Sequence, residues 1–148
     1  MTPVPSPVGR TAQVLGYLGI LPQLAAVSWV AFGESDAGAI AAAYPLLILS
    51  FLGGTWWGLA VRDGDAGEWM IVAVLPSLIA LALAGAILLS GGSPWAFVAI
   101  GCAILLTLPV DRALEGAGLA PRGWMELRIP LSIMLGTLTI LCGALLGR

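Results

Sequence analysis

Charged residues divide the chain into four long uncharged stretches, and this pattern predicts helices that cross a membrane. The stretches cover residues 11–33, 37–61, 69–110 and 129–147. A helix needs about 20 apolar residues to cross the hydrocarbon core of a bilayer. Three stretches therefore match one crossing each. The longest matches two crossings, because Gly91-Gly92-Ser93-Pro94 in its middle is typical of a turn followed by a helix start.

The predicted fold is all-α, a single integral membrane bundle of five transmembrane helices over residues 1–148. A flexible lead is expected at residues 1–10. The helices are expected near residues 13–32, 37–61, 69–90, 94–111 and 127–147. All acidic residues lie outside the uncharged stretches by definition, as a hydrocarbon environment requires.

Each predicted helix contains a proline, and three of these prolines are interior. Because an interior proline lacks an N–H and its ring crowds the preceding turn, Pro22, Pro45 and Pro76 are predicted to kink their helices. Pro109 and Pro130 lie near helix ends, where little bending is needed. Gln23 follows Pro22 and is expected to satisfy a backbone group freed there, in preference to binding a ligand.

The positions of the arginines predict the orientation of the bundle. With the N-terminus in the cytoplasm, only Arg148 lies outside, and the inner segments hold Arg10, Arg62, Arg112, Arg122 and Arg128. Cytoplasmic loops of membrane proteins carry an excess of basic residues. The pattern therefore predicts an N-terminus inside and a C-terminus outside.

Composition excludes several classes of protein. Hydrophobic residues make up 59% of the chain and charged residues 9%, and the mean hydropathy is +1.03. So small a soluble domain cannot bury that much apolar surface, and without a basic run the chain does not fit a nucleic-acid binder. Histidine is absent and all six basic residues are arginine. Histidine-based and lysine-based catalysis are therefore excluded, and no cofactor is expected.

The second predicted helix carries a seam of small residues. Ser50, Gly54 and Gly58 recur every four residues and so share one face. Such a face lets two helices approach closely in lipid. One interpretation is a packing face. The other is a notch, formed by Gly53 and Gly54 beside Trp57, in which an apolar ligand or a partner helix sits.

Most of the tryptophans fit the aromatic belt at the membrane surfaces. Trp56 and Trp57 stand out because they are adjacent. Neighbouring residues on a helix point about 100° apart. One of the two is therefore expected to face lipid, and the other to pack inward or line a pocket.

A candidate ion pair lies at the cytoplasmic face. Asp111-Arg112 and Arg128 flank the last inner loop. An unpaired charge at the interface is costly, so Asp111 is expected to pair with an arginine and to fix how the last two helices meet. The loop at residues 62–68 has three carboxylates but lacks the spacing of an EF-hand. A solvated turn is expected there.

The motif Ser50-Phe-Leu-Gly-Gly-Thr-Trp-Trp-Gly58 resembles the signature of a family known as domain of unknown function number 3429, which includes the mitochondrial transmembrane protein 69. Trp56 departs from the family pattern, in which a polar or basic residue precedes Trp57. Similar segments are Leu15–Pro22, Asp111-Arg112, Pro121, Trp124 and Leu127–Leu131. The resemblance implies a small multi-pass protein of bacterial inner or mitochondrial membranes. We expect the inner (plasma) membrane of a bacterium. The resemblance implies no reaction.

Three functions are compatible with these observations. The favoured hypothesis is a non-enzymatic packing or assembly protein, which contacts lipid and binds a partner membrane protein or a second copy of itself. The alternative is a binder or carrier of an apolar small molecule such as a lipid, quinone or pigment. The third is a lipid-acting enzyme that uses the carboxylates Asp63, Asp65, Glu68 or Asp111.

Overall fold

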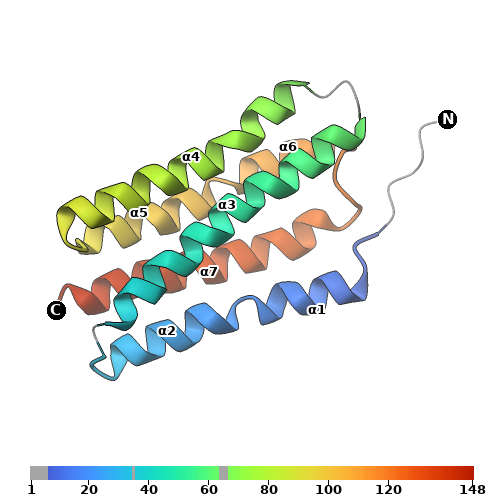
Figure 1. Ribbon diagram of the computed structural model, residues 1–148. Helices are drawn as coiled ribbons and strands as arrows, with labels where there is room; N and C mark the ends of the chain where they lie inside the picture. Colours follow the sequence, from blue (N-terminus) through green and yellow to red (C-terminus); the bar gives the residue numbers. More distant parts are fainter. Residues whose placement is uncertain (1–6, 35, 64–66) are drawn as a thin grey trace.

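The described part of the chain, residues 7–34, 36–63 and 67–148 of a computed structural model, is helical (Figure 1). Its helices are α1 (Arg10–Leu18), α2 (Leu21–Ala31), α3 (Ala37–Asp63), α4 (Gly67–Ser90), α5 (Pro94–Leu105), α6 (Leu108–Gly116) and α7 (Trp124–Leu146). Helices α1 and α2 together form one span, and α5 and α6 together form another. With α3, α4 and α7 they make five spans that are long and apolar enough to cross a membrane. For the described residues the all-α fold is confirmed, and so is the presence of five helical segments with the length and hydropathy of membrane spans.

The spans run in alternating directions, so that α1 begins at one end of the bundle and α7 ends at the other (Figure 1). Helix α3 lies at the centre and packs against α2, α4, α5 and α7. The connection from α6 to α7 lies at the same end as the start of α1. There the Val8 N–H donates to the Arg122 carbonyl at 3.1 Å. Of the predicted lead, residues 1–6 lie outside the described residues.

Two prolines divide their spans at a position that sterics explain. A proline ring clashes with the carbonyl of the residue four positions earlier. Helix α1 ends at Leu18, four residues before Pro22, and α5 ends at Leu105, four residues before Pro109. The break at Pro22 agrees with the predicted kink. The break at Pro109 differs from our prediction, because the helix continues as α6 to Gly116 instead of ending near the proline.

Helix α3 runs without a break through Pro45, and a neighbouring side chain explains how. The missing N–H of Pro45 frees the Ala41 carbonyl, which accepts a hydrogen bond from Gln23 Nε2 at 3.0 Å. A second hydrogen bond joins the same helices, because the Tyr44 hydroxyl of α3 donates to the Gly19 carbonyl at the α1–α2 break. Gln23 thus satisfies a carbonyl freed by a proline, but the predicted local role beside Pro22 is wrong, because the proline concerned is Pro45 on the neighbouring helix.

Glycines mark the closest approaches between helices. A Cβ atom on Gly53 would lie 2.5 Å from the Ala73 carbonyl oxygen of α4. On α7, a Cβ atom on Gly143 would lie 2.7 Å from the Pro94 carbonyl oxygen of α5. No side chain fits at such distances, so glycine is what allows these backbones to pack.

Candidate functional site

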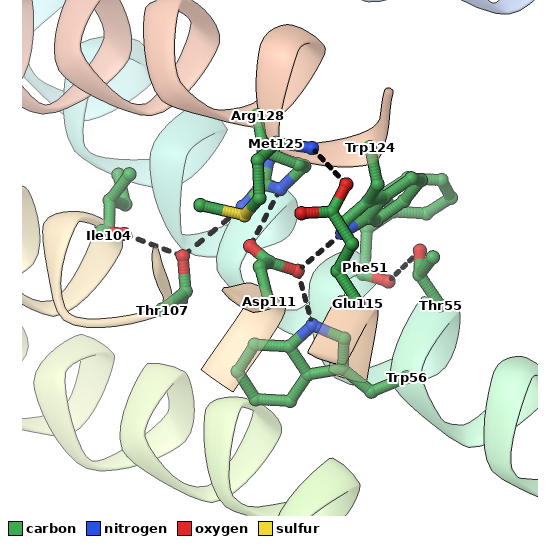
Figure 2. A network of polar contacts seen from close by, with 10 residues as sticks. All are labelled: Phe51, Thr55, Trp56, Ile104, Thr107, Asp111, Glu115, Trp124, Met125 and Arg128. Atoms are coloured by element: carbon green, nitrogen blue, oxygen red, sulfur yellow. Dashed lines mark hydrogen bonds and ion pairs between the residues drawn. The ribbon is translucent and has the colours of Figure 1, made fainter. Parts of the chain in front are cut away.

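A buried carboxylate lies where three spans meet. Asp111 stands in the first turn of α6, just after the Pro109 break, and it is completely buried. A carboxylate is favourable in the first turn of a helix because of the helix dipole. Trp56 reaches Asp111 from α3, and both Trp124 and Arg128 reach it from α7 (Figure 2).

Both carboxylate oxygens of Asp111 accept hydrogen bonds. Oδ1 accepts from Trp56 Nε1 at 2.8 Å and from Trp124 Nε1 at 3.0 Å. Oδ2 accepts from Arg128 Nε at 2.8 Å, which makes a salt bridge. Hydrogen bonds to an ionised group are about twice as strong as neutral ones. These contacts compensate the burial of the charge and join α3, α6 and α7.

The network continues from Arg128 to the break between α5 and α6. Arg128 Nη2 donates to Thr107 Oγ1 at 3.1 Å, and that hydroxyl donates to the Ile104 carbonyl at 2.7 Å (Figure 2). Arg128 itself is only 6% exposed. Its third nitrogen, Nη1, makes no hydrogen bond to any residue in the described ranges. This nitrogen therefore keeps its donor capacity.

Two apolar cavities adjoin this network. The first, of about 430 Å³, lies between α1, α3 and α7, and Trp124 and Arg128 line it at one end. The second, of about 290 Å³, lies between α3, α4 and α5, and Trp56 and Thr107 contribute to its wall. The walls of the first cavity otherwise consist mainly of apolar side chains, among them Leu15, Ile48, Phe51, Leu131 and Leu135.

Ser132 adds a second polar group to the wall of the first cavity. It follows Arg128 by four residues, so both side chains lie on the same face of α7. Ser132 is 1% exposed, and its Oγ has no hydrogen-bond partner within the described part of the chain. A buried hydroxyl without a partner costs about 1–3 kcal/mol in proteins. An acceptor or donor supplied by a bound molecule would remove this cost.

The predicted ion-pair residues divide into two groups. The structure brings Asp111 and Arg128 together, whereas the Arg112 side chain is exposed. Of the adjacent tryptophans, Trp56 is buried in the network and Trp57 is 46% exposed. One residue therefore packs inward and the other faces outward, as the helical geometry predicts.

The predicted small-residue seam does not form a pocket wall in the two cavities described above. Gly53 is buried against α4, while Gly54 and Gly58 face open space. Ser50 pairs with Ser77 of α4, with 3.0 Å between their hydroxyl oxygens. Gly53 and Gly54 are neighbours and so point in different directions. This is why the pair does not act as one notch beside Trp57.

Of the loop carboxylates, Asp65 lies outside the described residues and Glu68 is exposed at the start of α4. Asp63 ends α3. In residues 7–34, 36–63 and 67–148, no group of three histidine, cysteine or acidic residues is placed to hold a metal ion.

The comparison with known proteins gives one match. A family model described as "Protein of unknown function (DUF3429)" matches residues 8–144. No curated protein matches the chain. No solved structure matches it either.

Proposed function

The chain belongs to the DUF3429 family, and we propose that this member is a non-enzymatic membrane protein that binds an apolar or amphipathic small molecule between α1, α3 and α7. One observation carries the proposal. The cavity of about 430 Å³ has almost entirely apolar walls, yet Ser132 lines it, and the buried hydroxyl of Ser132 has no hydrogen-bond partner among the described residues. Ligand sites typically combine apolar walls with a few polar groups that orient the ligand.

The state of Asp111 supports a binding function over catalysis. Both of its oxygens accept hydrogen bonds from Trp56, Trp124 and Arg128. A general base has to lie within hydrogen-bond reach of the proton that it removes, whereas Asp111 is completely buried and is not among the lining residues of either cavity. The carboxylate is instead engaged in joining helices and in holding Arg128 at the end of the cavity.

Native mass spectrometry of the purified protein tests this proposal. We expect the protein to retain a small molecule through mild detergent extraction. Ala12→Trp places a large ring at the edge of the cavity, where Ala12 is exposed, and is expected to reduce retention at least five-fold. The matched control is Ala82→Trp, at an exposed alanine of α4 outside this cavity. Protein that is always free of ligand would contradict the proposal.

A second candidate function, assembly with another membrane helix, has support on a different surface. Gly54 and Gly58 have open space above them, and Trp57 next to them is 46% exposed. This face of α3 is compatible with close approach of a helix from a partner membrane protein or a second copy.

For assembly, we expect Gly54→Leu with Gly58→Leu to lower the mass of the particle purified in mild detergent, because the leucines would separate the two helices. Light scattering after size exclusion measures this mass. Gly85→Leu is the control, since Gly85 of α4 also faces open space. Wild-type protein that is already monomeric without a partner would count against assembly.

We also propose that the bundle lies in the inner membrane of a bacterium, with the N-terminus inside. The distribution of the arginines supports this orientation, since only Arg148 lies at the opposite end. Alkaline phosphatase fused after Arg148 is expected to be active, because this enzyme folds only outside the cytoplasm. Activity of a cytoplasmic reporter at the same position would reverse the orientation.

A further inference from the structure

We infer that the occupant of the cavity is a neutral amphiphile with an oxygen acceptor, of the carbonyl class, at its polar end. This inference rests on the proposed function and specifies the class of ligand. The polar end would lie against Arg128 and Ser132, and the apolar part would lie along the walls formed by α1, α3 and α7.

The hydrogen-bond donors in the cavity wall favour a ligand that carries a hydrogen-bond acceptor. A guanidinium has donors only, and a serine hydroxyl can donate one proton. Arg128 uses Nε and Nη2 within the protein, which leaves Nη1 available among the described contacts. Ser132 lines the same cavity, and its buried hydroxyl has no partner among the described residues. A carbonyl oxygen accepts and does not donate, so it matches either of these donors.

The charge balance of the site selects a neutral ligand. Asp111 and Arg128 are 2.8 Å apart and offset each other's charge. Among the described residues that line the cavity, Arg128 alone is charged. An anionic group would therefore leave one uncompensated negative charge in apolar surroundings, which is strongly unfavourable.

The position of the polar groups selects an amphiphile. Arg128 lies at one end of the cavity wall on α7, and Leu135 lies about 10 Å further along the helix axis. The side chains between these residues and those facing them are mostly apolar. A molecule with its oxygen at Arg128 therefore needs an apolar chain or ring beyond it.

Three probes with the same twelve-carbon chain test the inference. They are 2-dodecanone, dodecyl phosphate and dodecane, added at equal concentration to the purified protein in detergent. The readout is Tm, because a ligand that binds only the folded state raises it. For wild type we expect 2-dodecanone to raise Tm by about 3 °C and the other two probes to have less than a third of this effect.

The variant Ser132→Ala distinguishes an effect on ligand binding from an effect on the stability of the fold. Because it removes a buried hydroxyl that has no partner in residues 7–34, 36–63 and 67–148, we expect Tm without ligand to be unchanged or higher. The apparent affinity for 2-dodecanone should fall about five- to ten-fold, which corresponds to one hydrogen bond. The control is Ser77→Ala, because Ser77 pairs with Ser50 and does not line this cavity.

The possible outcomes distinguish a wrong class of ligand from a wrong proposed function. Equal shifts for all three probes, unaffected by Ser132→Ala, would overturn the ligand class and leave a purely apolar binding site. A larger shift with dodecyl phosphate would also overturn it, in favour of an anionic ligand. If no probe shifts Tm although native mass spectrometry finds a ligand, the inferred class of ligand is wrong but the proposed binding function stands. If no ligand is found either, the class and the proposed function both fail.

Discussion

Asp111→Ala is expected to lower the free energy of unfolding by about 3–5 kcal/mol, the usual effect of removing one partner of a buried ion pair. The variant leaves Arg128 buried at 6% exposure without its counter-charge. It also leaves the indole N–H groups of Trp56 and Trp124 without their acceptor. Reversible unfolding in mixed micelles of dodecyl maltoside and SDS measures the change.

Arg112→Ala provides the matched control, because it removes a charged side chain that is exposed and adjacent to Asp111. Its effect is expected to stay within about 0.5 kcal/mol. Combining Asp111→Ala with Arg128→Leu should destabilise the protein less than the sum of the single changes, since no isolated charge stays buried. Strict additivity would show that the two charges do not depend on each other.

The spans are predictable from the sequence because a bilayer imposes a simple local rule. An uncharged stretch must be long enough to cross the hydrocarbon core, and the break at Gly91–Ser93 separates two crossings. The breaks at Pro22 and Pro109 agree with a similarly local rule, since each helix ends four residues before the proline. Helix α4, in contrast, runs through Pro76 without such a break. The continuity of α3 through Pro45 depends instead on Gln23, which is distant in sequence. No local pattern predicts that contact.

The site was predictable only where charge makes burial costly. A lone aspartate beside a predicted membrane segment needs an arginine, and Arg128 lies on the next span. Trp56 and Trp124 were missed as ligands of this carboxylate, because an indole near a membrane surface fits the aromatic belt equally well. The one signal for Trp124 is its position four residues before Arg128, which places both on one face of α7.

Ser132 and the cavity around it have no signature in the sequence. A serine in a membrane helix usually donates to the carbonyl four residues earlier, and nothing in the sequence distinguishes Ser132 from the other serines. Its lack of a partner becomes visible only when α1, α3 and α7 are placed around it. The shape of a cavity depends on three distant segments at once, whereas hydrophobic periodicity describes one segment at a time.

Gly53→Ala is expected to destabilise the bundle by about 1–3 kcal/mol, the usual range for overpacking. The new Cβ atom would meet the Ala73 backbone oxygen at 2.5 Å, so α3 and α4 would have to separate. Gly54→Ala is the control, since its Cβ atom meets nothing within 4 Å. We expect no loss of stability there, because alanine is the better helix former. Unfolding in mixed micelles compares the two variants.

This pair of variants also separates the two interpretations of the small-residue motif. If Gly53→Ala alone lowers stability, internal packing accounts for Gly53, and the open surface at Gly54 and Gly58 has to be explained by something outside the bundle. If both variants lower the stability of the particle and Gly54→Ala also reduces its mass, the seam on α3 contacts another subunit. Equal stability of Gly53→Ala and wild type would mean that α3 and α4 do not approach as closely as 2.5 Å implies.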